Sequence, residues 1–442
     1  MKEIKLSNHL LLGSATAATQ IEGGDKYSNW YEWSLKGKID RGESSIVAAD
    51  HYNRYVEDID LMKSMNHEIY RMSIEWSRIE PKEGQWSQEG IDHYVSEIKM
   101  LLNNGIKPLV TLHHFSHPQW FEAMGQWKNK KSVFYFIRFA DKVVDELGRY
   151  VNEYCTINEP NVFVNDSFMD GKYPPGDKDN TIGYFKASKH MIQAHIKAYD
   201  LIHSKRKAMG YDDTKVGIAL HIAYMEAKKN TFINRLGRNL YDYSFHTMFL
   251  NGMVEGRLTF PLGLFNSSNK TYCDFMGINY YSRHLVHQNL NPASLFGEVR
   301  VEENLHDSEV NDLGWEIYPE GLYHILKDNY EKYGLPIYIT ENGIPDTLDK
   351  KRAKFIYDHL SVIQNLIDDG IDVQRYYHWS LMDNLEWNDG YGPRFGLVEI
   401  NYETLERKVR DSGHFYAEIC KSKYISKHLI HQYLGGETSG NI

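Results

Sequence analysis

Cysteine is scarce in this chain of 442 residues, which contains only three: Cys155, Cys273 and Cys420. Their spacing fits neither a zinc site nor a redox motif, and an odd number does not suggest a disulfide framework. We therefore expect buried thiols in a reducing compartment. Residues 1–12 also lack a signal-peptide pattern, which favours a cytoplasmic location.

Long apolar runs and excess positive charge are missing as well. No stretch approaches the ~20 apolar residues of a membrane span, so we expect no membrane partner. The formal net charge of −10 and a single short basic cluster at residues 128–131 argue against a nucleic-acid partner. Aromatic residues are abundant, with 32 Tyr and 9 Trp. Their flat faces with polar edges suit the binding of sugar rings.

The order of short apolar runs and longer segments of helical period predicts an α/β fold. The runs predicted as strands are residues 10–16, 68–74, 106–113, 151–157, 216–221, 274–280, 335–341 and 373–381. Predicted helices include 50–65, 91–103 and 133–147, and in the first of these Tyr52, Tyr55, Val56, Ile59 and Met62 share one face.

Eight strands alternating with helices predict a single (β/α)₈ TIM barrel over residues 1–442, with loop insertions at the carboxyl face of the strands. An open doubly wound sheet is the alternative, but it would usually show a glycine-rich phosphate loop after the first strand. Leu11 to Ser14 is not such a loop, and no cofactor is expected. Residues 282–312 are predicted to form a loop insertion, and the polar, glycine-rich residues 435–442 a mobile tail.

Two glutamates stand at the carboxyl ends of predicted strands. Ile337 to Thr340 is β-branched and aromatic without polar alternation, as in a parallel strand covered on both faces, and Glu341 follows it. Glu159 ends the fourth strand, before Pro160. In a closed barrel these two ends face each other across the mouth. Two carboxylates in one cleft are the minimum machinery for glycoside hydrolysis, although two unrelated loop acids would fit the same placement.

Other strand ends are polar or aromatic in the same way, and supply hydrogen-bonding groups and flat faces for a sugar. They carry Gln20, Arg71, His113, His114, Asn279, Tyr280, Tyr281, Trp379, Glu386 and Trp387. A metal cluster of His113, His114 and His117 is the competing interpretation. Neighbouring strand residues point to opposite faces and no acidic ligand follows nearby, so we expect no metal site.

Many short motifs resemble glycoside hydrolase family 1, the β-glucosidase and β-glycosidase family, nearly from end to end and in the family's order. They lie at residues 13–16, 20–23, 50–52, 70–74, 76–78, 110–114, 156–160, 173–176, 277–281, 314–319, 335–343, 379–381 and 383–387. The resemblance implies that Glu159 is the acid/base and Glu341 the nucleophile. It implies further roles in substrate binding for Gln20, His114, Asn158, Tyr281, Trp315, Trp379, Glu386 and Trp387. Arg71 and Asn279, together with Tyr281, resemble the support around the nucleophile.

Departures from the family pattern concern specificity. Phe115, Ser116 and His117 stand where the family often has Trp-Asp-Leu, and Leu385 stands where Phe or Tyr is usual. The branch acting on 6-phosphorylated sugars typically has Ser, Lys and Tyr where this chain has Glu386, Pro393 and Phe395. A carboxylate at Glu386 would repel a phosphate, so we expect unphosphorylated β-glycosides or oligosaccharides as substrates.

The expected reaction is hydrolysis of a terminal β-linked sugar by double displacement with retention. Glucose, galactose and fucose are all candidates for the terminal sugar, because Glu386 can contact hydroxyls on either epimer. A transglycosylase using the same intermediate and a non-catalytic glycan-binding protein are the alternatives. Both acids are present, which favours an enzyme. The sequence leaves the natural leaving group and the number of subunits open.

Overall fold

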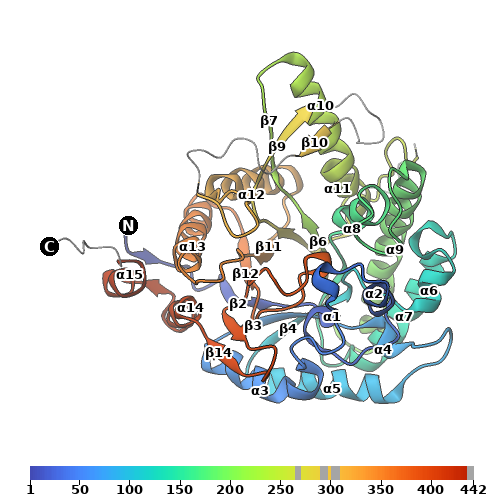
Figure 1. Cartoon of the computed structure of the whole chain (residues 1–442), viewed down its shortest axis with the longest axis horizontal. Coiled ribbons are helices and arrows are strands. Elements are labelled where there is room, and N and C mark those ends of the chain that lie inside the picture. The colour runs from blue at the N-terminus through green and yellow to red at the C-terminus, as the bar shows by residue number, and fades with distance from the viewer. Residues whose placement is uncertain (264–269, 289–296, 300–308, 436–442) are drawn as a thin grey trace.

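The fold is built on a closed barrel, seen in a computed structural model that describes residues 1–263, 270–288, 297–299 and 309–435 (Figure 1). Eight parallel strands follow one another around the ring in chain order. They are β2 (Leu11–Ala15), β3 (Ile69–Ser73), β4 (Lys107–His113), β5 (Glu153–Asn158), β6 (Lys215–His221), β8 (Phe275–Asn279), β11 (Ile337–Asn342) and β12 (Val373–Trp379).

Pairing between the last and first of these strands decides between the barrel and the open sheet. Strand β12 pairs in parallel with β2, from Arg375 opposite Leu11 to Trp379 opposite Ala15. Every residue of β11 is buried, as the absence of polar alternation at residues 337–340 predicted, and every residue of β3 is buried as well. All eight predicted strands are present with small shifts at their ends, and the barrel prediction is confirmed.

One principal helix follows each barrel strand in the chain and packs outside the ring (Figure 1). These are α3 (His51–Ser64), α5 (Gln88–Asn103), α7 (Ser132–Leu147), α9 (Thr181–Ala208), α11 (Met248–Met253), α12 (Pro319–Tyr333), α13 (Arg352–Asp368) and α14 (Asp411–Ser422). The additional helices are α1 (Ala18–Ile21), α2 (Asn29–Leu35), α4 (Trp76–Ile79), α6 (Gln119–Ala123), α8 (Pro160–Phe168), α10 (Phe232–Asp242) and α15 (Lys427–Leu434). A π-helical turn, η3 (Tyr243–Thr247), continues α10.

The predicted buried face of α3 is partly wrong. Ile59 and Met62 are buried, but Val56 is 46% exposed. The remaining buried positions belong to His51 and Asp58, which take part in a buried ionic network. His51 lies between Asp58 (Nδ1–Oδ2 2.8 Å) and Glu97 (Nε2–Oε1 3.0 Å). The buried side of this helix therefore carries charged residues, one of which, His51, is paired with Glu97 of another helix.

The insertion predicted as a loop at residues 282–312 contains strands. β9 (Arg283–Gln288) pairs with β10 (Gly297–Val299) and with β7 (Tyr224–Ala227), which forms a small sheet outside the barrel. β7 comes from the connection after β6, so the pairing joins two insertions that are far apart in the sequence. Residues 289–296 and 300–308 of this insertion lie outside the described part, as does the predicted mobile tail beyond Gly435.

Two further pairings involve the chain ends and the last loop. β1 (Ile4–Lys5) pairs with β15 (Tyr424–Ile425), and β13 (Val398–Ile400) with β14 (Arg407–Val409). Cys155, Cys273 and Cys420 are buried free thiols, as expected. Among the described residues, no helix has both the length and the apolar character required to cross a membrane.

Candidate active site

Glu341 lies at the carboxyl end of β11, held by a cation and a hydroxyl. Arg71 Nη1 donates to its Oε1 at 2.5 Å, and Tyr281 Oη donates to its Oε2 at 2.6 Å. Glu341 is only 3% exposed and Arg71 is fully buried. Burial raises the pKa of the Glu341 carboxyl above its ordinary value, although the charge of Arg71 and the hydroxyl of Tyr281 act in the other direction and limit the rise. These contacts stabilise the ionised form.

Glu159 follows β5 directly and caps the start of α8. Its backbone is left-handed, with φ of +38°, a conformation that few residues other than glycine adopt. Asn279 Nδ2 donates to its Oε1 at 2.8 Å. The pKa of Glu159 lies well above 4.5, because burial disfavours the charged form and the charge of Glu341 adds to this effect. Glu159 is therefore the group that holds a proton.

Two buried amides connect the glutamates. Asn158 Oδ1 accepts from Arg71 Nη2 at 2.7 Å and from Asn279 Nδ2 at 3.0 Å. Asn279 Oδ1 in turn accepts from the hydroxyl of Thr340 at 2.6 Å. Because β3, β5, β8 and β11 each contribute a member, this cluster depends on the closed ring. It joins the cation beside one carboxyl to the amide beside the other.

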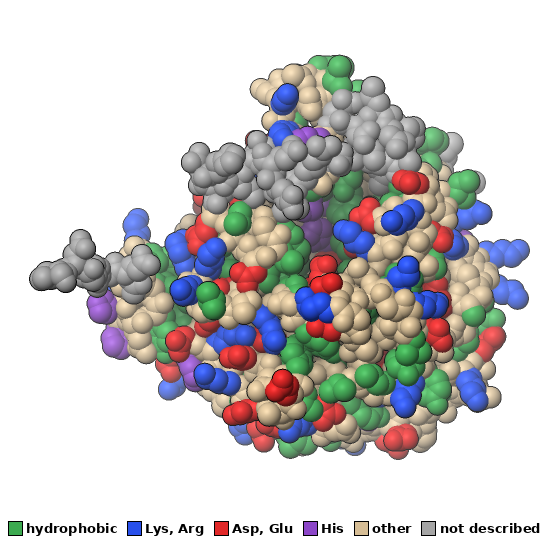
Figure 2. Space-filling view, in the orientation of Figure 1, with side chains coloured by type: hydrophobic (Ala, Val, Ile, Leu, Met, Phe, Trp, Pro, Cys, Tyr) green, Lys and Arg blue, Asp and Glu red, His purple; other side chains and the backbone are tan. Residues whose placement is uncertain are grey.

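A cavity of about 480 Å³ opens at this end of the barrel. Of the twelve residues predicted for the site, eight line it: Glu159, Glu341, His114, Tyr281, Trp315, Trp379, Glu386 and Trp387. The other four are fully buried: Arg71 and Asn279, which contact a glutamate, Asn158, which contacts Arg71, and Gln20, which contacts Asn384. In Figure 2 the surface is hollowed below the uppermost part of the molecule, with histidine and hydrophobic side chains inside the hollow.

Aromatic side chains flank the cavity. The ring of His114 is roughly parallel to Trp379 and to Trp387, with centroids 5.9 Å away in each case. Trp315 meets Tyr281 edge to face, with centroids 5.8 Å apart. Flat apolar faces of this kind suit the C–H surfaces of a sugar.

Several polar atoms near the cavity have no hydrogen-bond partner, among them Gln20 Oε1, His114 Nδ1, His284 Nδ1 and Glu386 Oε2. A buried polar atom without a partner costs about 1–3 kcal/mol, so such atoms are rare and demand an explanation. Gln20 is held by two bonds from its Nε2, to Asn384 Oδ1 (2.9 Å) and to the Leu385 carbonyl (2.7 Å). These two bonds fix the position of Gln20 Oε1, which can accept a hydrogen bond.

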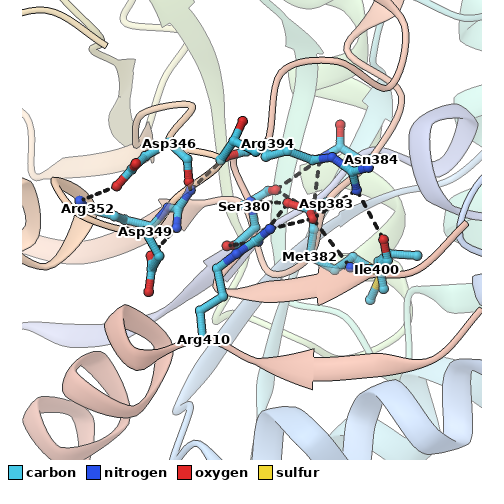
Figure 3. Close-up of polar contacts among 12 residues, drawn as sticks. Asp346, Asp349, Arg352, Ser380, Met382, Asp383, Asn384, Arg394, Ile400 and Arg410 are labelled. Carbon is cyan, nitrogen blue, oxygen red and sulfur yellow. Dashed lines mark hydrogen bonds and ion pairs between the residues drawn. The ribbon is translucent and has the colours of Figure 1, made fainter. Parts of the chain in front are cut away.

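Asp383 organises the loop that carries Glu386 and Trp387, and its role was missed from the sequence. Arg410 binds it through two bonds of 2.8 Å, and Arg394 adds one of 3.2 Å (Figure 3). Asp383 also accepts backbone N–H groups from Gly396 (3.0 Å) and Ile400 (3.3 Å). The motif at residues 383–387 marked the segment, but the partners of Asp383 come from distant positions.

The neighbouring Asn384 connects this loop to Gln20. Its Nδ2 donates to Ser380 Oγ at 2.9 Å and to the Met382 carbonyl at 3.1 Å (Figure 3), while its Oδ1 holds Gln20.

The outer part of the cavity was also missed. It is lined by Phe115, Asp166, Lys172, His221, Tyr241, Phe245, His284 and Val299, among others. His221 ends β6, and its Nδ1 lies 3.7 Å from Glu159 Oε1. His221 could have been predicted, because polar residues at the carboxyl ends of the barrel strands are candidates for the site. Tyr241, Phe245 and Val299 belong to insertions without motifs, and no signal in the sequence pointed to them.

The three neighbouring histidines have separate partners. His113 accepts from Trp127 Nε1 at 3.2 Å, His117 contacts Glu122 at 2.7 Å, and only His114 lines the cavity. Within the described residues no group of three or more His, Cys, Asp or Glu side chains is arranged to hold a metal ion.

Comparison with known proteins identifies the family. The sequence model of glycosyl hydrolase family 1 matches residues 2–425. Beta-glucosidase A of Acetivibrio thermocellus is 35% identical, over 96% of this chain and 99% of that protein. The solved beta-glycosidase from Pyrococcus horikoshii is similar with a TM-score of 0.90 and 35% identity, covering 98% of each chain. The solved Thermotoga maritima beta-glucosidase in complex with glucoimidazole is similar with a TM-score of 0.87 and 32% identity, covering 96% of this chain and 100% of that one. With two glutamates held in contrasting surroundings and matches along nearly its whole length, the chain belongs to glycosyl hydrolase family 1 and is a glycoside hydrolase.

Proposed function

We propose that the protein hydrolyses terminal, unphosphorylated β-D-glucosides with retention, Glu341 acting as nucleophile and Glu159 as acid/base. One observation carries the proposal: the two carboxyls share a cavity but have opposite environments. Glu341 contacts a cation and a hydroxyl, whereas the hydrogen bond to Glu159 comes from a neutral amide. Environments that separate the pKa values of two carboxyls assign the acid and the base.

In the first step Glu341 attacks the anomeric carbon while Glu159 donates its proton to the departing oxygen. The carbon–oxygen bond to the leaving group breaks as the glycosyl ester forms on Glu341. Esterification removes the charge of Glu341, which is one of the causes that raise the pKa of Glu159. The pKa of Glu159 therefore falls when the ester forms, and Glu159 stays ionised after it has given up its proton.

In the second step Glu159 removes a proton from water, which attacks the anomeric carbon and releases Glu341 as a carboxylate. The returning negative charge raises the pKa of Glu159 again, so the proton stays there for the next cycle. The same electrostatic coupling serves both steps, and Arg71 stabilises Glu341 each time it is released.

The charge of the cavity supports an unphosphorylated substrate. Its lining contains the carboxyls of Asp166, Asp170, Asp179, Glu341 and Asp389, against one lysine, Lys172. Glu159 and Glu386 also line it, but burial raises their pKa values well above the ordinary value. A phosphate on the sugar would meet this excess of acidic groups. The free oxygens of Gln20 and Glu386 and the free Nδ1 of His114 are suited to sugar hydroxyls.

Two bacterial relatives are named beta-glucosidase A, which supports glucose as the terminal sugar. Activity on β-galactosides and β-fucosides, the cytoplasmic location and the single-domain organisation stay predictions.

Trapping with a 2-deoxy-2-fluoro aryl β-glucoside tests the proposal, because the fluorine slows release of the ester more than its formation. Mass spectrometry of proteolytic fragments should find one sugar on Glu341, and NMR of the first product from an ordinary aryl β-glucoside should show the β anomer. A label on another residue or an α first product would refute the mechanism. Sugar acceptors that outcompete water would identify a transglycosylase, and binding without turnover would identify a glycan-binding protein.

A further inference from the structure

Helix α10 turns its apolar side chains toward solvent. Their exposed fractions are 73% for Phe232, 56% for Ile233, 47% for Leu236 and 39% for Leu240. At 100° per residue these four positions fall on one face of the helix. The side of the helix next to this stripe carries Gly237, which is buried, and Tyr241, which lines the cavity. The apolar stripe of α10 therefore faces solvent and is not buried against the barrel.

Phe260 lies beside this face. Tyr243, one turn beyond the exposed stripe, donates from its Oη to the Phe260 carbonyl at 2.6 Å, and the Phe260 side chain is 74% exposed. We call Phe232, Ile233, Leu236, Leu240 and Phe260 the α10 patch. α10 lies at the upper edge of the molecule in Figure 1, where hydrophobic side chains also show in Figure 2. Large apolar side chains that are exposed together on one face of a helix are typical of an interaction surface.

The charges next to the α10 patch are basic, although the whole chain is acidic with a net charge of −10. Lys229 and Arg235 are exposed, and Arg235 Nη1 contacts a neutral oxygen, Asn230 Oδ1, at 2.7 Å. The nearest carboxylate on the helix, Asp242, is bound to His246 at 2.9 Å. The patch thus combines apolar side chains with cations.

Charge decides which occupant fits. A second copy of the chain, docked by the same patch about a two-fold axis, would bring the cations of both copies together. An anionic bilayer matches both parts: apolar side chains enter the acyl boundary and Lys and Arg meet the headgroups. We propose that the α10 patch, with Lys229 and Arg235, docks the protein on an anionic lipid surface.

This docking needs no membrane-spanning segment. Because α10 also supplies Tyr241 to the cavity wall, it brings the outer part of the cavity close to the bilayer.

Co-sedimentation of the full chain with vesicles tests the proposal. The vesicles are phosphatidylcholine alone or an equal mixture with phosphatidylglycerol, in low and high salt. The wild type should bind the mixed vesicles and be released by salt. A Phe232→Ser/Leu236→Ser/Phe260→Ser variant should lose at least tenfold in partition coefficient. Lys229→Gln/Arg235→Gln should lose about fivefold or more on anionic vesicles only.

The matched control is Phe134→Ser/Ile182→Ser, which removes two side chains of similar exposure, 64% and 70%, from α7 and α9. It should bind vesicles like the wild type, and all variants should keep wild-type turnover of a soluble aryl β-glucoside, which shows that they are folded. A wild type that does not bind mixed vesicles, or a triple variant that binds equally well, overturns the proposal. So does light scattering that finds a dimer dependent on the α10 patch, because the patch would then join two copies.

Discussion

The hydroxyl of Tyr281 should set the lower pH limit of activity. Its bond to Glu341 Oε2 is 2.6 Å long and stabilises the ionised carboxyl, which is only 3% exposed. A hydrogen bond to a charged group contributes about 1.5–3 kcal/mol. Since one pKa unit corresponds to about 1.36 kcal/mol, Tyr281→Phe should raise the pKa of Glu341 by roughly 1–2 units.

The assay is kcat/KM for an aryl β-glucoside as a function of pH. Glu341 must be ionised to attack, so the acidic limb of the profile reports its deprotonation in the free enzyme. A higher pKa for Glu341 moves that limb to higher pH. The alkaline limb, which reports loss of the Glu159 proton, should move less. Because the two carboxyls interact, both limbs are properties of the pair.

Tyr280→Phe is the matched control. This neighbouring tyrosine is buried, and its hydroxyl donates to the carbonyl of Tyr318 at 2.5 Å instead of to a glutamate. Both variants lose one hydroxyl and keep the ring, but only Tyr281→Phe should shift the acidic limb. If Tyr281→Phe leaves that limb in place, or if Tyr280→Phe shifts it equally, the reasoning is refuted.

Three further outcomes are expected. Glu159→Gln should slow substrates with poor leaving groups far more than activated aryl glycosides, and a uniform loss across a leaving-group series would contradict the acid role. Asp383→Asn leaves the buried Arg410 without its carboxylate, and should lower the free energy of unfolding by about 3–5 kcal/mol in urea titrations. An unchanged free energy of unfolding would mean that the ion pair between Asp383 and Arg410 does not stabilise the fold. Burial opposes the charged form of His51, but its hydrogen bonds to two carboxylates outweigh this and raise its pKa to about 10. Its stabilisation is complete below about pH 6.5 and is lost as the pH rises toward 10, so the destabilisation by His51→Asn should shrink over that range.

The sequence by itself determined the eight strands and the placement of both glutamates. Strands buried on both faces need unbroken β-branched and aromatic residues, and residues 337–340 show this pattern without any help from the rest of the chain. Glu159 and Glu341 could be found because a reacting group at a strand end has a fixed position in the chain. The motifs of the family added the supporting residues in the same local way.

Only the tertiary structure decided how these groups act on one another. Arg71 reaches Glu341 across 270 positions, and Asn279 reaches Glu159 across 120. The different hydrogen-bond partners of the two glutamates, the anchoring of residues 380–387 through Asp383 and the outward-facing stripe of α10 all depend on contacts that sequence spacing does not encode. Burial and hydrogen bonding are properties of a three-dimensional neighbourhood, so they exist only once the ring of strands has closed.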